Sequence, residues 1–108
     1  DLSPLIQKAL QMVKKEYDQG ITLEEMADKL FVSEEYLSSQ FKKEIGVGFK
    51  EMVRTLQIER IKELLTNTKL KLNQIAELAG YSDAKYMSRV FKDEVGVLPS
   101  EFRKSAHC

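Results

Sequence analysis

Apolar residues recur at intervals of three and four along almost the whole chain, and no stretch shows the alternation of apolar and polar positions that indicates a strand. The stripe formed by Leu23, Met26, Ala27 and Leu30 is typical of an amphipathic helix with one buried face. Similar stripes follow to the C-terminus, separated by glycine or by residues that start helices. The pattern therefore predicts an all-α protein with about seven helices.

Start and stop signals divide the chain into these helices. Ser3 before Pro4 is a favourable helix start, and Thr22 with Glu25 predicts a capping box. We expect one domain over residues 1–108, which can divide into two small subdomains that share one long amphipathic helix. Its expected parts are a first helix to about Asp18, a helix-turn-helix over 22–47, the linking helix over 49–66, a second helix-turn-helix over 71–97 and a C-terminal helix over 99–105.

The two helix-turn-helix segments are copies of one unit. They align at a spacing of 49 residues as far as Ser33 and Ser82, and at a spacing of 50 afterwards, so the second copy has one extra residue. The identical pairs are Leu23 and Leu72, Ala27 and Ala76, Ser33 and Ser82, Tyr36 and Tyr86, Ser38 and Ser88, Phe41 and Phe91, Lys42 and Lys92, Glu44 and Glu94, Gly46 and Gly96, and Val47 and Val97. An internal repeat of this kind sets the architecture.

Four aromatic residues of the repeat fall on the apolar stripes and are expected in the core. They are Tyr36, Phe41, Tyr86 and Phe91. Because the stripes face inward, we predict buried side chains rather than platforms on which single-stranded bases stack. Ser33 is expected to cap the second helix of the first copy, and Ser82 or Asp83 that of the second copy.

The composition fits a single-domain chain. It has 108 residues, 43% of them hydrophobic, enough to bury a sizeable core. No apolar run approaches the roughly 18 residues of a membrane span and no signal sequence is present, so we expect a cytoplasmic protein with no membrane contact. The single cysteine, Cys108, excludes an internal disulfide and agrees with a reducing compartment. The missing initiator Met suggests a piece of a longer protein.

Catalytic chemistry finds little support in the sequence. The only histidine, His107, and the only cysteine lie at the C-terminus, which leaves no catalytic triad and too few ligands for zinc. No glycine-rich loop follows a strand to hold phosphates. We therefore predict that the protein is not an enzyme and uses no metal or cofactor.

The charges are balanced overall but unevenly distributed. Seventeen basic residues offset seventeen acidic ones, whereas nucleic-acid binders are usually basic. Residues 20–43 hold three basic and five acidic side chains, while residues 69–92 hold five basic and two acidic ones. If the protein binds DNA, the second copy should supply the electrostatic attraction and the first should be a weaker or more selective reader.

The sequence of the second copy resembles a known family. Ile75–Lys104, IAELAGYSDAKYMSRVFKDEVGVLPSEFRK, is similar to the signature of AraC/XylS-type bacterial transcription regulators, and Leu23–Leu65 resembles the rest of their DNA-binding domain. The resemblance covers nearly the whole chain and is strongest to the output domains of YesN-type response regulators. It implies sequence-specific binding of double-stranded DNA and regulation, most often activation, of transcription.

The resemblance also implies that one monomer places two recognition helices in successive major grooves. A linking helix of about 18 residues spans roughly 27 Å, and the loops bring the helices toward the roughly 34 Å of one DNA turn. The half-sites then need not be palindromic. Further expected partners are RNA polymerase and an upstream receiver or ligand-sensing domain.

Outward residues near the start of each recognition helix are the candidates for reading bases. Arg89 is the strongest, because its guanidinium can pair with guanine O6 and N7. The first copy departs from the commoner family pattern, which often has Arg where Ser39 stands, and Glu35 can either accept from cytosine N4 or repel phosphate. The full base-reading set is Ala84, Lys85, Ser88, Arg89, Glu35, Ser38 and Ser39. Phosphate contacts are expected from Lys42, Lys43, Arg54, Lys92, Arg103, Ser33 and Ser82.

A helical module that binds proteins and has lost DNA binding is the alternative. The neutral net charge and the acidic first copy favour it. Lys85, Arg89 and Lys92, however, share one face of the second recognition helix, where a partner-binding helix would show an apolar stripe. The sequence therefore favours DNA.

Overall fold

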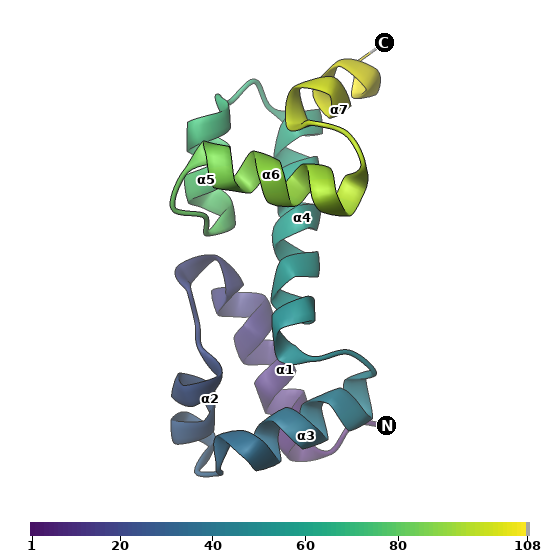
Figure 1. Cartoon of the computed structure of the whole chain (residues 1–108). Coiled ribbons are helices and arrows are strands. Elements are labelled where there is room, and N and C mark those ends of the chain that lie inside the picture. The colour runs from purple at the N-terminus through teal and green to yellow at the C-terminus, as the bar shows by residue number, and fades with distance from the viewer. Residues whose placement is uncertain (108) are drawn as a thin grey trace. The chain divides into compact units, whose positions relative to one another are not determined.

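The computed structural model describes residues 1–107, which form seven α-helices, one short 3₁₀ helix and no strand (Figure 1). The helices are α1 (Pro4–Glu16), η1 (Tyr17–Gln19, the 3₁₀ helix), α2 (Leu23–Leu30), α3 (Glu34–Ile45), α4 (Phe49–Asn67), α5 (Leu72–Ala79), α6 (Ala84–Val95) and α7 (Pro99–Ala106). The predicted all-α class with seven α-helices is confirmed. The first helix ends at Glu16 rather than near Asp18, because the chain tightens into η1 before Gly20.

The predicted cap residues begin the helices of the first half. The Ser3 hydroxyl accepts a hydrogen bond from the N–H of Ile6, with Pro4 as the first residue of α1. At α2, the Thr22 hydroxyl accepts from the N–H of Glu25, and the Glu25 carboxylate accepts from the N–H of Thr22, each at 3.1 Å. These reciprocal bonds satisfy N–H groups that a helix start leaves unpaired.

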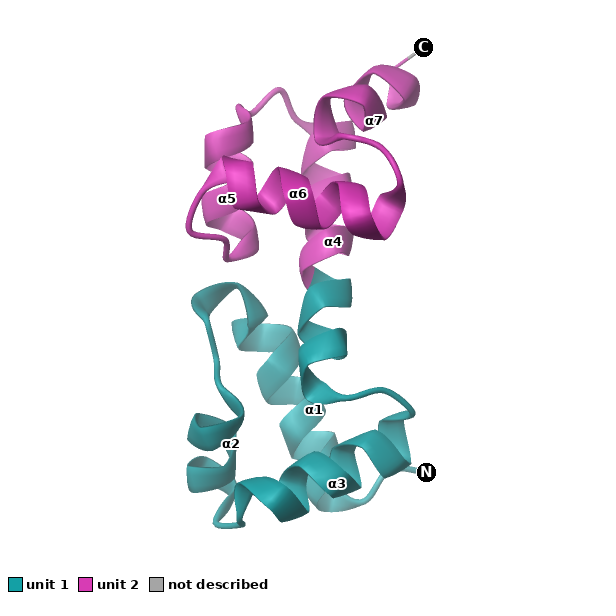
Figure 2. Cartoon of the chain, in the orientation of Figure 1, with its two compact units in different colours: residues 1–56 teal, residues 57–108 magenta. Residues whose placement is uncertain are grey.

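The chain divides into two compact units, residues 1–56 and 57–108 (Figure 2). In the first unit α1 packs against both α2 and α3. Its buried core consists of Ile6, Ala9, Val13, Met26, Ala27, Leu37 and Phe41. The buried core of the second unit consists of Ile58, Ile61, Leu64, Leu65, Ile75, Ala76, Ala79, Met87, Val90 and Phe91. Each helix-turn-helix therefore has a core of its own.

Helix α4 serves both cores, but not with the single apolar stripe that the sequence predicted. Phe49, Met52, Val53 and Leu56 pack in the first core, and Ile58, Ile61, Leu64 and Leu65 are buried in the second. Ile58 lies only two positions after Leu56 and is therefore out of step with the apolar residues that precede it in α4. None of the helices within residues 1–107 has the length and apolar composition that a bilayer span requires.

Candidate nucleic-acid interface

The two helix-turn-helix copies correspond residue by residue outside their turns. Helix α5 begins and ends 49 residues after α2, and α6 begins and ends 50 residues after α3. The extra residue of the second copy therefore lies in the turn, which comprises residues 31–33 in the first copy and 80–83 in the second. In the structure Ser33 thus corresponds to Asp83, and not to Ser82 as the sequence alignment had paired it.

Each recognition helix, α3 or α6, begins at a side-chain cap. The Ser33 hydroxyl accepts from the N–H of Tyr36 at 3.1 Å, and the Asp83 carboxylate accepts from the N–H of Tyr86 at 2.7 Å. The Ser33 cap is confirmed. Of the two candidates in the second copy, Asp83 is the cap, and exposed Ser82 lies in the turn before it.

Both turns pass through the left-handed backbone region at the residue after the first helix. This residue is Gly80 in the second copy, with φ of 90°, and Phe31 in the first, with φ of 59°. The N–H of the next residue, Val32 or Tyr81, bonds back to the carbonyl of Ala27 or Ala76, which closes both turns in the same way. The Phe31 side chain is 94% exposed, so the first turn presents an aromatic ring to solvent.

Helix α6 has a buried apolar face and an exposed basic face. Met87, Val90 and Phe91 are buried, and Lys85, Arg89 and Lys92 are exposed. Ala84 and Ser88 are half-buried at the edges of the exposed face. The second copy therefore presents one patch with three cations, which suits an anionic polymer.

The corresponding face of α3 is polar and carries the acidic residues of its first turn. Leu37 and Phe41 are buried, whereas Glu35, Ser38 and Ser39 are exposed together with Glu34. Two carboxylates stabilise the positive end of the helix dipole and also repel phosphate. The two copies thus share a scaffold but differ in charge, because the first turn of α3 carries two carboxylates whereas the exposed face of α6 carries three cations.

The tyrosines of the repeat do not lie in the core. Phe41 and Phe91 are fully buried as predicted, but Tyr36 is 53% exposed and Tyr86 is 46% exposed. The prediction for these two residues was wrong, because each lies at the border of the apolar stripe and the next residue along the helix fills the core instead. The Tyr86 ring leans on Tyr81, with ring centroids 5.8 Å apart.

The lysines predicted to contact phosphate lie near the ends of the recognition helices. Lys42 and Lys43 in the last turn of α3, and Lys92 in that of α6, are exposed. Cations in a last turn also complement the negative end of the helix dipole. Arg54 is exposed on α4. All four side chains are exposed, and their contacts with phosphate remain a prediction.

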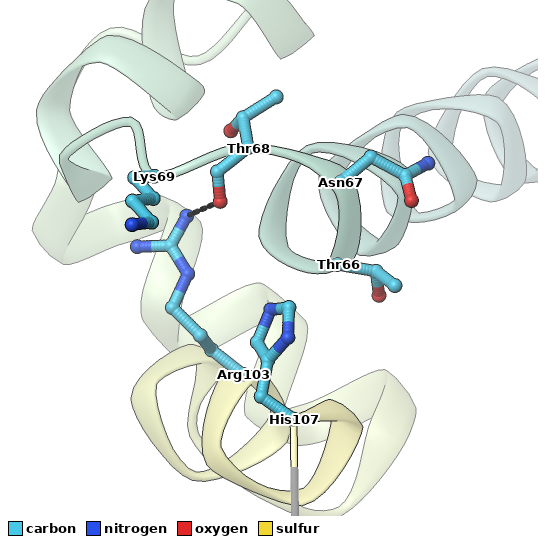
Figure 3. A pocket seen from close by; sticks show the side chains of 6 residues that line it. All are labelled: Thr66, Asn67, Thr68, Lys69, Arg103 and His107. Carbon is cyan, nitrogen blue, oxygen red and sulfur yellow. Dashed lines mark hydrogen bonds between the residues drawn. The ribbon is translucent and has the colours of Figure 1, made fainter.

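Arg103 has a role inside the second unit that the sequence did not predict (Figure 3). Its Nε donates to the carbonyl of Leu65 at 3.1 Å, Nη1 to that of Leu70 at 2.8 Å, and Nη2 to that of Thr68 at 3.2 Å. Three of the five N–H donors of the guanidinium thus satisfy carbonyls at and beyond the end of α4. The half-buried side chain ties α7 to the connection between α4 and α5, whereas the sequence had assigned it to phosphate.

A cavity of about 380 Å³ lies beside Arg103. It is lined by Thr66, Asn67, Thr68, Lys69, Arg103 and His107 (Figure 3). Lys69 follows the C-terminal end of α4 and Arg103 lies in the last turn of α7, where helix dipoles are negative. The positive charge beside the cavity therefore balances the negative ends of these two helices.

Glu44 holds the start of α1 against α3. Its carboxylate accepts from the N–H of Ser3 at 2.7 Å and from the Ser3 hydroxyl at 2.8 Å, and Gln40 Nε2 donates to it at 3.2 Å. These bonds, first among them the one from the Ser3 N–H, lower the pKa of Glu44 below its ordinary value of 4.5, and nearby Lys43 adds to the effect. The contact joins residues 41 apart in the sequence.

Within residues 1–107, no group of three or more His, Cys, Asp or Glu side chains is placed to hold a metal ion. Cys108, which follows His107 in the sequence, lies outside the described residues.

Comparison with known proteins gives consistent matches. The family described as "Helix-turn-helix domain" matches residues 26–105. The C-terminal domain of AraT, a response regulator from Geobacillus stearothermophilus, is 37% identical with a TM-score of 0.91 over 96% of this chain and 87% of that one. The C-terminal domain of the two-component response regulator yesN from Fusobacterium nucleatum is 33% identical with a TM-score of 0.82, over 90% of this chain and 96% of that one.

A full-length relative is also similar. The uncharacterized HTH-type transcriptional regulator YijO of Escherichia coli K12 is 32% identical over 95 residues, which are 88% of this chain and 34% of that protein. The chain thus spans about a third of the length of this curated relative.

Proposed function

This chain belongs to the AraC-type family of helix-turn-helix domains found in DNA-binding transcription regulators, and we propose that it reads a bipartite DNA site with α3 and α6 in successive major grooves. The exposed basic face of α6 supports this proposal most strongly. Lys85, Arg89 and Lys92 are exposed together, while the opposite face of the same helix is fixed in the core. A rigid helix with outward cations is what major-groove reading requires.

In the second copy, Arg89 and Lys85 are the proposed base readers, with Ala84 and Ser88 beside them. Arg89 is exposed in the first half of α6, where its guanidinium can pair with both acceptors of a guanine. Ala84 can pack on a thymine methyl, and Ser88 can accept or donate. This half-site should therefore contribute most of both affinity and specificity.

In the first copy, Glu35, Ser38 and Ser39 are the proposed readers. Glu35 is suited to accept from cytosine N4, but it also opposes the phosphate backbone. This half-site should therefore bind weakly and discriminate mainly against wrong sequences.

Phosphate contacts are proposed for Lys42, Lys43, Arg54, Lys92, Ser33 and Ser82, all of which are exposed. Arg103 is proposed to act mainly by fixing α7, since its guanidinium already binds three carbonyls. Such contacts orient a protein on the duplex without reading sequence.

The place of this domain in its regulator is also a proposal. Two similar structures are C-terminal domains of response regulators, which supports an upstream receiver or sensing domain here. Activation of transcription through RNA polymerase, a cytoplasmic location and the absence of enzymatic activity fit a regulator that acts on the chromosome. Phosphorylation of the intact protein should then change its affinity for DNA.

Selection of the 108-residue chain against random duplex DNA at moderate salt tests the proposal. We expect an asymmetric site with two blocks about ten base pairs apart. A single block would assign base reading to the second copy alone. Absence of enrichment and of salt-dependent retention would contradict the proposal and favour a protein-binding module.

A further inference from the structure

Two tyrosines occupy the same position in the two recognition helices. Tyr36 is the third residue of α3 and Tyr86 the third of α6, and each is about half exposed. The following residue, Leu37 or Met87, is fully buried. The core therefore does not need the tyrosines, although both copies of the motif have one at this place.

Both tyrosines border the face that is proposed to enter the groove. At about 100° per residue, Tyr86 lies about 60° around α6 from Arg89 and about 100° from Lys85. Tyr36 has the same relation to Ser39 and Glu35 on α3. Side chains at the border of a reading face meet the edge of the groove, where the phosphates lie, rather than its floor.

The first turn of a helix is favourable for an anion. The N–H groups of Tyr36 and Tyr86 are bound to the caps Ser33 and Asp83, so both rings project from the positively polarised end of the helix. Among residues 1–107, neither tyrosine hydroxyl makes a hydrogen bond. Tyr81 supports the Tyr86 ring at 5.8 Å, whereas the corresponding position beside Tyr36 is Val32.

We propose that the hydroxyls of Tyr36 and Tyr86 each donate a hydrogen bond to a DNA phosphate at the edge of the groove and thereby fix the depth of the two recognition helices. Tyrosine is among the side chains that bind phosphate oxygens. The inference rests on the proposed function and adds to it a pair of neutral contacts. Because a neutral donor displaces no counterion, these contacts add affinity that does not depend on salt.

Tyr36→Phe and Tyr86→Phe test the proposal in the 108-residue chain. The probes are a duplex selected by the parent chain and a scrambled duplex of the same length, titrated at several salt concentrations. Each variant should bind both duplexes about 5- to 10-fold more weakly, as expected for a lost hydrogen bond. The slope of log K against log salt should not change, whereas Lys92→Ala, which removes a proposed phosphate contact, should reduce it by about one.

Tyr17→Phe is the control, because Tyr17 lies in η1, outside both helix-turn-helix motifs. It should leave the affinity for both duplexes unchanged, and Tyr36→Phe and Tyr86→Phe should keep the parent's thermal midpoint. If both Tyr36→Phe and Tyr86→Phe bind with the parent's affinity, the proposal is wrong. A loss of affinity for the selected duplex alone would also overturn it, as would a loss of affinity accompanied by a lower thermal midpoint. If the parent chain itself shows no salt-dependent DNA binding, the proposed function is wrong as well. This result comes from the parent chain and is thus distinguishable from the results of the tyrosine variants.

Discussion

At the residue scale, the two turns differ where the repeat has Phe31 in one copy and Gly80 in the other. Both residues adopt positive φ, which glycine tolerates and a phenylalanine adopts only at a cost of roughly 1 kcal/mol. The Phe31 ring is almost fully exposed and thus regains little by packing. The left-handed conformation of Phe31 therefore lowers the stability of the first turn.

Phe31→Asn should raise the free energy of unfolding by about 0.5 kcal/mol, because asparagine adopts the left-handed region more readily. Phe31→Gly should raise it less, since glycine also gives the unfolded chain more freedom. Chemical denaturation measures both. Gly80→Ala is the matched control and should lower the free energy of unfolding by about 1 kcal/mol. A lower stability of Phe31→Asn would show that no strain resides at this turn.

A second expectation at this scale concerns Arg89. Arg89→Ala should cost about 1–3 kcal/mol of binding to the selected site and relax the preference at one base pair. Binding of single-substitution duplexes measures this directly. An equal loss of affinity on every sequence in Arg89→Ala would exclude base reading by Arg89.

Glu35→Ala should instead weaken discrimination between sequences in the other half-site, while leaving non-specific affinity unchanged or raising it.

At the scale of helices, hydrogen bonds between residues far apart in the sequence hold the helices against one another. Ser3 caps α1 and at the same time binds Glu44 near the end of α3, where a carboxylate is unfavourable for the helix dipole. Arg103 similarly joins α7 to carbonyls at and beyond the end of α4. Neither partner could be identified from local pattern, because the residues are more than thirty positions apart.

The Glu44 contact makes the first unit sensitive to acid. Since the pKa of Glu44 is lowered in the folded protein, its contribution to stability is present above the unfolded value and is lost as pH falls through the folded one. Glu44→Gln should therefore lower the thermal midpoint at pH 7 and change it much less near pH 3. Glu59→Gln, at an exposed position of α4, is the control and should have little effect at either pH. Equal losses at both values would mean that the charge of Glu44 is irrelevant.

At the scale of the whole molecule, the two cores have no residue in common although α4 contributes to both. The division into residues 1–56 and 57–108 cuts through α4 and not through a loop. A destabilising substitution in one core should therefore lower the stability mainly of the unit that contains it. This expectation can be tested with a matched pair, because Phe41 and Phe91 are equivalent and both fully buried.

Phe41→Ala and Phe91→Ala should each cost about 3–5 kcal/mol in the unit that contains the residue. Hydrogen exchange followed by mass spectrometry should show faster exchange of amides in residues 1–45 for the first variant and in residues 70–107 for the second. Amides of the other unit should keep more of their protection. Uniform loss of protection in both variants would mean that the chain unfolds as one cooperative unit.

Local sequence patterns were enough to predict the helices, their caps at Ser3, Thr22 and Ser33, the repeat and the basic face of α6. These features follow from signals within a few residues, namely the 3.6-residue period and side chains that bind nearby N–H groups. The family resemblance depended on the same local motifs and is confirmed by the comparisons.

Which border residues of each stripe are buried depends instead on how the helices pack against one another. Tyr36 and Tyr86 are half exposed, Asp83 rather than Ser82 is the cap, and Arg103 binds carbonyls instead of remaining an outward cation. Periodicity defines a helix face only to within about one residue, or about 100°. How a helix rotates against its neighbours, and which distant carbonyl or carboxylate a long side chain reaches, depends on packing between segments far apart in the chain.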